Sequence, residues 1–166
     1  TALSGSYTVN DRDVGNTITA SIVGTPVVQL NGQAFTLPSS AQALISTGVF
    51  TISPATRLST GSNSPAATPV GWSYDPTAVD LDFLSKDEQL TITYSLKVND
   101  GTNDSNTVNT TITIVGTNDA PSITVGTGNS NTASLSETNN TLTASGTLTV
   151  TDIDTTDIVN TSRTQI

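Results

Sequence analysis

The clearest pattern in the chain is an alternation of apolar and polar residues over residues 88–100, EQLTITYSLKVND. Because successive side chains of a β-strand point to opposite faces, this segment has one apolar and one polar face. The pattern predicts a half-buried antiparallel strand. Its inward-facing residues are Leu90, Ile92, Tyr94, Leu96 and Val98.

Two hairpins follow from similar patterns. Residues 106–115, NTVNTTITIV, repeat the alternation, and the turn before them, NDGTNDSN, is dense in Gly, Asn and Asp. Their inward-facing residues are Val108, Ile112 and Ile114. Residues 27–37, VVQLNGQAFTL, contain Asn31-Gly32, a pair that suits a type I′ turn because both central residues need positive φ. We therefore expect a strand on each side of both turns.

The rest of the chain has no long stretch of helical periodicity. The patterns predict further strands at residues 49–53, 70–74 and 141–150, a loop at 57–69, and one short helical turn at 76–84. Many short strands separated by turn residues are typical of an antiparallel β-sandwich. The predicted fold class is therefore all-β.

The beginning of the chain is echoed near its end. Residues 4–18, SGSYTVNDRDVGNTI, match residues 145–159, SGTLTVTDIDTTDIV, at an offset of 141 residues with six of fifteen positions identical. Both copies place Asp-x-Asp where an alternating strand gives way to turn residues. A self-similarity at a domain-sized offset indicates tandem repeats.

The segment GTNDAPSI, residues 116–123, is the predicted junction, because Pro121 enforces an extended backbone there. The sequence thus predicts a sandwich repeat over residues 1–118 that lacks its first strand. Residues 119–166 form the linker and the first strands of a following, incomplete repeat. We expect this second part to be disordered or to supply the missing strand to a sandwich, in cis or from a neighbouring chain.

Composition narrows the chemistry. The chain has no Cys, His or Met, so it offers no thiolate or imidazole as nucleophile, base or soft-metal ligand. Its net charge is −9, and five scattered cations form no patch for nucleic acid. No apolar run reaches the roughly 20 residues that span a bilayer, so no membrane insertion is expected. Because the chain begins with Thr1 and its second repeat is cut off, we expect a piece of a longer polypeptide.

The acidic residues are the main candidates for a binding site. In an extended segment the side chains at i and i+2 point the same way, so each Asp-x-Asp turns two carboxylates toward one point. Two carboxylates about 5 Å apart repel by about 3 kcal/mol at an effective dielectric of about 20, and a bound dication reverses that sign. Calcium accepts carboxylate, amide and backbone oxygens. The alternative is that these aspartates simply cap backbone amides in turns.

Catalysis is not expected. A carboxylate pair can hydrolyse glycosides, but this requires a cleft, and nothing in the sequence resembles one lined by substrate-stacking aromatics. A serine nucleophile has no histidine to activate it. Trp72 and Tyr74 lie at i and i+2 of one predicted strand, which favours core positions over a sugar-stacking platform.

Two segments resemble a known family. Residues 71–121, from GWSYDPTAVDLDFLSKDEQ through the NDG hairpin to GTNDAP, resemble the C-terminal half of a VCBS repeat, and residues 135–157, LSETNNTLTASGTLTVTDIDTTD, resemble the start of the next. Residues 24–70 match poorly and look like an insertion. The resemblance implies immunoglobulin-like, cadherin-like sandwiches of large secreted bacterial surface proteins, including RTX-type adhesins of biofilms.

The resemblance also implies calcium ligands. The cadherin-like pattern places three contributors at the junction between repeats, which match Asp87 and Glu88, Asn118 and Asp119, and Asp152 and Asp154. It assigns Asp11, Asp13 and Asp100 to the preceding junction. The function implied is a structural extender or stalk stiffened by Ca²⁺. Its expected partners are neighbouring repeats of the same polypeptide, with strand exchange or self-association.

A second function remains open from the sequence. The same surface protein could use residues 24–70 together with Trp72 and Tyr74 to bind a carbohydrate or another ligand. Exposed aromatic rings would favour this alternative, whereas buried rings would favour the stalk.

Overall fold

The computed structural model describes residues 2–61, 69–154 and 156–163. It divides the chain into unit 1, Thr1–Leu81 with Glu88–Val115, and unit 2, Asp82–Asp87 with Gly116–Ile166. The sequence had placed both the 82–87 turn and residues 116–118 in the first domain. No helix within the described ranges is long and apolar enough to cross a bilayer.

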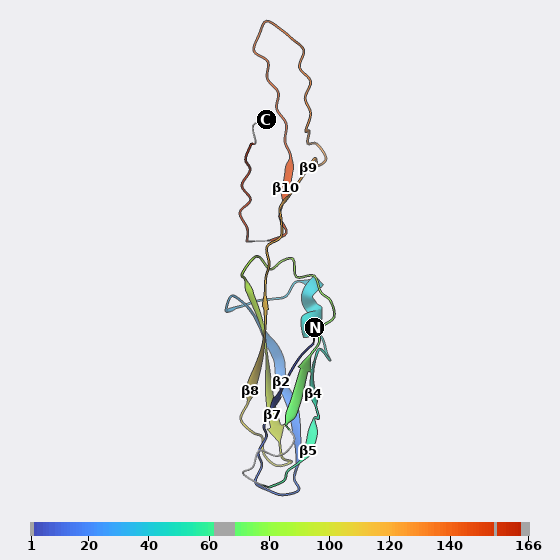
Figure 1. Cartoon of the computed structure of the whole chain (residues 1–166), viewed down its shortest axis with the longest axis vertical. Helices are drawn as coiled ribbons and strands as arrows, with labels where there is room; N and C mark the ends of the chain where they lie inside the picture. The colour runs from blue at the N-terminus through green and yellow to red at the C-terminus, as the bar shows by residue number, and fades with distance from the viewer. Residues whose placement is uncertain (1, 62–68, 155, 164–166) are drawn as a thin grey trace. The chain divides into compact units, whose positions relative to one another are not determined.

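Unit 1 consists of two antiparallel sheets (Figure 1). The first has the order β1-β6-β4, with β1 at Leu3–Tyr7, β6 at Val70–Tyr74 and β4 at Phe50–Ser53. The second has the order β3-β2-β7-β8, with β5 also paired to β2. Its strands are β3 (Gln33–Ala34), β2 (Thr17–Leu30), β7 (Gln89–Asn99), β8 (Val108–Val115) and β5 (Thr56–Leu58). The all-β prediction is therefore confirmed.

The core lies between these sheets. Strand β7 buries Leu90, Ile92, Tyr94 and Leu96 at alternate positions, as the sequence predicts. The Tyr94 ring stacks on Phe50 of the other sheet with centroids 4.3 Å apart, which joins the two layers. Such pairs add to the area that they bury, so this contact helps to fix the spacing of the sheets.

A short 3-10 helix, η1 at Ser39–Ile45, covers one part of this core. It buries Ala41 and Leu44, which are three residues apart and therefore share one face of a 3-10 turn. The hydroxyl groups of Tyr74 and Tyr94 both donate to the Leu44 carbonyl oxygen, at 3.0 and 3.5 Å. The helical turn predicted at residues 76–84 is wrong, because those residues form turns and irregular backbone instead.

Burial decides the role of the two aromatic residues in β6. Tyr74 is 2% exposed. Trp72 is half-buried and stacks on Phe50 with centroids 5.6 Å apart. The prediction that Trp72 and Tyr74 pack inward is confirmed, and this packing gives no support to a sugar-stacking platform.

The hairpin prediction at Asn31-Gly32 is confirmed. Leu30 of β2 pairs with Gln33 of β3, and φ is 51° at Asn31 and 80° at Gly32. Residues 24–70, which the sequence treats as an insertion, supply most of the smaller elements of unit 1. They contain η1, β3, β4 and β5, so this stretch belongs to both sheets.

Unit 2 has one short ladder. Strand β9 (Ser122–Thr124) pairs antiparallel with β10 (Thr149–Thr151), and Ile123 lies opposite Val150 (Figure 1). The strand predicted at residues 141–150 therefore forms only at its end. A two-stranded ladder covers little apolar surface, and Ile123 is 63% exposed and Val125 49% exposed.

Candidate metal sites

The two Asp-x-Asp motifs adopt the same local structure. The Asp13 amide donates to Asp11 Oδ1 at 3.1 Å, and the Asp154 amide donates to Asp152 Oδ1 at 3.2 Å. Both motifs lie in bends, so the expectation of an extended segment with two parallel carboxylates is wrong. The physical reason is that a short Asp side chain readily bonds the backbone two residues on.

In unit 2 the central feature is the buried carboxylate of Asp154. This residue is 2% exposed, and its Oδ2 accepts the Asp119 amide at 2.8 Å. Its Oδ1 is buried and has no hydrogen-bond partner in the described part of the chain. A buried carboxylate oxygen without a donor or cation is costly, so Asp154 is suited to receive a positive ligand.

Backbone hydrogen bonds link three of the predicted ligands here, because the Asp119 amide donates to Asp154 Oδ2 and the Asp154 amide donates to Asp152 Oδ1. Asn118 is exposed and its amide donates to the Asp119 carbonyl oxygen. These contacts lie within unit 2 and tie the linker to the second Asp-x-Asp motif. The arrangement therefore offers carboxylate, amide and backbone oxygens within a short stretch of structure.

The other two residues predicted for this junction lie differently. Asp87 is exposed with φ of 66°, and its carboxylate lies 4.0 Å from the Lys86 ammonium. Its amide donates to the Gly116 carbonyl oxygen at 3.2 Å, so its backbone rather than its carboxylate contacts the linker. Glu88 belongs to unit 1, where it accepts the Asn31 side-chain amide at 3.3 Å beside the hairpin.

The sequence did not single out two contacts that organise this part of unit 2. The hydroxyl groups of Ser85 and Thr156 are 2.6 Å apart and join the 82–87 turn to the segment after Asp154. A Cβ at Gly116 would lie 2.2 Å from the Ser85 carbonyl oxygen, so only glycine permits this approach. In the sequence, only Gly116 at the start of GTNDAP could have indicated this close backbone contact.

In unit 1 a second acidic site surrounds a cavity of about 140 Å³. Its lining includes Asn10, Asp11, Asp100, Asn103 and Asp104. Asp11 Oδ2 is buried and has no hydrogen-bond partner among the described residues. The structure therefore places Asp11 and Asp100 at one cavity, whereas Asp13 is exposed.

Asp100 is held by its own turn. Its Oδ1 accepts the Asn103 and Thr102 amides, each at 2.7 Å. These hydrogen bonds, with the Asn103 amide contributing most, lower the pKa of Asp100. The carboxylate therefore stays ionised under conditions in which a free aspartate begins to protonate, which keeps an anion at the cavity.

The sequence missed Asp104. Its carboxylate accepts Lys97 Nζ at 2.6 Å and the Asn99 side-chain amide at 2.9 Å. The hydrogen bond from Lys97, followed by that from Asn99, lowers the pKa of Asp104. The sequence did offer one indication of this contact. Lys97 lies on the polar face of a strand that leads into an acidic turn.

The donor atoms indicate which cation each site could hold. No three acidic side chains form a ready metal cluster within the described ranges. A cation would therefore draw on backbone and Asn oxygens in addition to carboxylates, which calcium accepts. Three buried side-chain atoms lack a hydrogen-bond partner among the described residues, namely Asp11 Oδ2, Arg57 Nε and Asp154 Oδ1. The two that belong to the candidate sites are carboxylate oxygens, which fit a hard cation.

The chain was compared with protein-family models, curated proteins and solved structures, and no match was found. The VCBS resemblance of residues 71–121 therefore stays a prediction from the sequence.

Proposed function

We propose that this chain is part of a calcium-stiffened stalk, built from tandem immunoglobulin- or cadherin-like repeats of a secreted bacterial adhesin or surface filament. The observation that carries the proposal is the buried, unpartnered Oδ1 of Asp154, in a turn that repeats the Asp11 turn 141 residues earlier. A repeated acidic turn with an unsatisfied carboxylate oxygen is better explained by a recurring cation than by turn capping alone.

The strand order supports the immunoglobulin-like part of the proposal. Immunoglobulin-like sandwiches have strands A, B, E and D in one sheet and C, F and G in the other. In unit 1, β1-β6-β4 corresponds to B-E-D, and β2-β7-β8 corresponds to C-F-G, with β3 at the C′ position. Strand A has no counterpart among the described residues of unit 1, which is compatible with a repeat that lacks its first strand.

Calcium would act on the linker of unit 2. Asp119, Asp152 and Asp154 would hold the ion together with nearby backbone oxygens, and the ion would supply the positive charge that Asp154 Oδ1 lacks. Since the Asp119 amide is bonded to Asp154, fixing this carboxylate also fixes the linker. At about ten times its dissociation constant, calcium would add about 1.4 kcal/mol to the stability of the site.

Asp11 and Asp100 would form a second site in unit 1, with Asn10 and Asn103 available as neutral ligands. The proposed role is mechanical, because ordered linkers would hold a binding tip away from the cell. Calcium titration by calorimetry, with magnesium as the comparison, tests the proposal. Saturable calcium binding that is weakened in Asp154→Asn supports it, and the absence of calcium binding at millimolar concentrations would refute it.

A further inference from the structure

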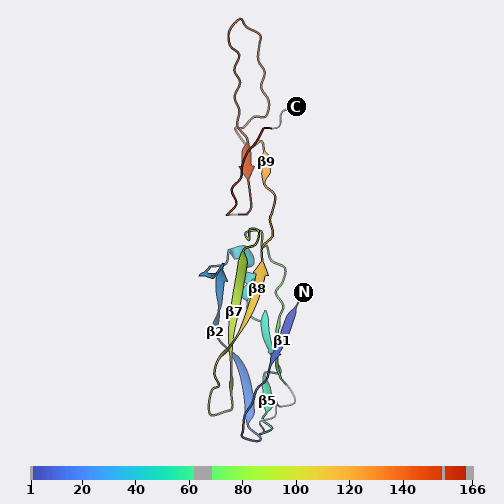
Figure 2. The same cartoon turned by 60° about the vertical axis from the view of Figure 1, so that its left-hand side comes forward.

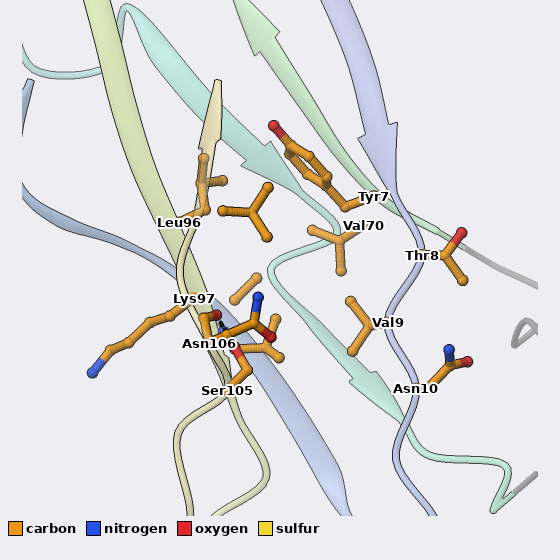
Figure 3. A pocket seen from close by; sticks show the side chains of 12 residues that line it. Tyr7, Thr8, Val9, Asn10, Val70, Leu96, Lys97, Ser105 and Asn106 are labelled. Carbon is orange, nitrogen blue, oxygen red and sulfur yellow. Dashed lines mark hydrogen bonds between the residues drawn. The ribbon is translucent and has the colours of Figure 1, made fainter. Parts of the chain in front are cut away.

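Unit 1 has an open seam between the edge strands β1 and β8. Figure 2 labels both strands. One part of this seam is closed, because the Tyr7 hydroxyl contacts Thr110 Oγ1 and donates to the Asn109 carbonyl oxygen at 3.3 Å. Beyond that contact the seam opens into a cavity of about 280 Å³ (Figure 3). Its lining is mixed: the aliphatic residues are Val9, Ala20, Val70, Leu96, Val98 and Val108, and the polar residues are Thr8, Asn10, Lys97, Ser105 and Asn106.

At the seam a residue is exposed that the alternation of apolar and polar residues predicts to face the core. Val108 was predicted to face the core, but it is 40% exposed and lines the cavity. Figure 3 shows Tyr7 and Val9 turned into the cavity, whereas Thr8 and Asn10 point to the other side. The backbone after β1 therefore keeps the alternation of a strand and presents Val9 to the open space.

This backbone has no strand partner in the described part of the chain. The ladder between β1 and β6 ends where Tyr7 pairs with Val70, and residues 8–10 lie beyond it. Strand β1 is also an outer strand of its sheet. An unpaired, extended segment beside a cavity with aliphatic residues in its lining is a site where another strand can add.

The second copy of the repeat shows which strand fits. At the offset of 141 residues, residues 8–10 correspond to Thr149–Thr151, which form β10. In unit 2 β10 pairs with β9, and Ile123 lies opposite Val150, the counterpart of Val9. Residues opposite each other in a ladder point to the same face, so Ile123 would enter the cavity together with Val9.

We propose that the seam of unit 1 binds β9 (Ser122–Thr124) of a second copy of this chain, antiparallel to residues 8–10 and with Ile123 opposite Val9. The exchange requires β9 to leave β10, which costs a ladder of only three residue pairs. In return Ile123, 63% exposed in unit 2, becomes buried. The segment around β9, PSITVGT, combines Ile123 and Val125 with uncharged polar residues, which matches the mixed lining of the cavity.

The contact would be head-to-tail, because the seam and β9 are different surfaces. Contacts of this kind form rings or open filaments rather than closed two-fold dimers. Val9 and Asn10 also line the acidic cavity of unit 1, and β10 leads into Asp152. The assembly is therefore tested in excess EDTA, in which neither proposed calcium site is filled.

Disulfide cross-linking tests the register directly, because the chain has no cysteine of its own. Val9→Cys and Ile123→Cys single variants are mixed and oxidised, and the products are analysed by non-reducing electrophoresis and mass spectrometry. The proposal expects a mixed dimer in large excess over either homodimer. Thr8→Cys mixed with Ile123→Cys is the matched control, because Thr8 points away from the cavity (Figure 3).

The Val9→Cys/Ile123→Cys double variant distinguishes the source of the strand. Disulfide-linked multimers in dilute solution support exchange between copies. A monomer that holds only an intrachain disulfide would overturn the proposal, because the strand would then come from the same chain. Equal cross-linking at Thr8 and Val9 would also overturn it.

Sedimentation velocity of the unmodified chain gives a second test. Its average mass should rise with concentration, whereas Ile123→Lys should remain monomeric, because a lysine at this position would replace the aliphatic contact with Val9 by a second positive charge in a cavity that Lys97 already lines. Ile158→Lys is the matched control, since Ile158 is 86% exposed and lies outside β9. A monomer at all concentrations up to about 10 times those of the cross-linking experiment would contradict the proposal.

Discussion

The carboxylate of Asp154 has two oxygens in different surroundings. Oδ2 accepts the Asp119 amide, and Oδ1 is buried without a partner among the described residues. One atom therefore organises the linker while the other is available to a cation. This division of roles within one side chain makes single-residue substitutions informative.

Replacement of Asp154 by Asn should separate calcium binding from folding. Asn keeps the size of the side chain and an oxygen for the Asp119 amide, but it removes the charge that calcium requires. We expect calcium to raise the melting temperature of the parent chain by about 5 °C or more at about ten times its dissociation constant. The variant should lose the part of this rise that comes from the unit 2 site but keep its stability in EDTA, as measured by calorimetric melts.

Asp157→Asn is the matched control for that experiment, because Asp157 is exposed in the same segment. It should keep the full calcium response. An equal loss of response in both variants would mean that calcium acts through the general acidity of the chain rather than through Asp154.

We expect Tyr74 to lower the stability of the folded chain at alkaline pH. Burial, and to a smaller extent the neighbouring Tyr94, raises the pKa of Tyr74 to about 12. In the unfolded chain a tyrosine ionises near pH 10, so ionisation favours the unfolded state and stability falls as the pH rises from about 10 to about 12. Urea unfolding across this range should show a smaller alkaline loss in Tyr74→Phe.

The same variant should be less stable at neutral pH. It lacks the hydrogen bond to the Leu44 carbonyl oxygen, whose loss should cost about 1 kcal/mol. Identical alkaline slopes for the parent chain and Tyr74→Phe would show that Tyr74 does not govern this response.

At the level of elements, two sets of hydrogen bonds stabilise the acidic turn between β7 and β8. Its backbone is held by Asp100, and its ends by the contacts of Asp104 with Lys97 and Asn99. The pKa of each carboxyl group is lowered by these contacts. The stabilisation is therefore present above the unfolded pKa of about 3.9 and is lost as the pH falls through the lowered values.

In Asp104→Asn the free energy of unfolding should depend less on pH in the acid range. Unfolding by urea in EDTA, measured between about pH 2 and pH 6, should show a smaller loss of stability toward low pH than in the parent chain. Asp75→Asn removes an exposed charge of the same unit and serves as the control. A parent-like acid limb in Asp104→Asn would contradict this account of the turn.

Sequence patterns predicted the elements that depend on local rules. The alternation in β7 and the Asn31-Gly32 turn suffice because strand periodicity and positive φ are local properties. The helix at Ser39–Ile45 was missed, because it is stabilised by packing of Ala41 and Leu44 on distant strands. The candidate sites also depend on contacts between distant residues. The sequence indicated Asp154, but it could not show that Oδ2 accepts the Asp119 amide or that Oδ1 is buried without a partner among the described residues.

Over the whole molecule, stability should differ between the two units. Unit 1 has an extensive core around β7, whereas the apolar residues of the unit 2 ladder are largely exposed. Amides of β7 should therefore exchange with deuterium far more slowly than those of β9 and β10. Hydrogen exchange followed by mass spectrometry measures this, and equal protection in both units would show that unit 2 has gained cover in solution.

The local structure of the two Asp-x-Asp turns bears on how a chain with such copies could evolve. Each turn is closed by a hydrogen bond between residues two positions apart, from Asp13 to Asp11 and from Asp154 to Asp152. The turn is thus encoded entirely within its own copy. In the proposed array of tandem repeats, recombination that adds or removes whole copies would leave every remaining turn intact, so the length of the gene could vary without new compensating mutations at these positions.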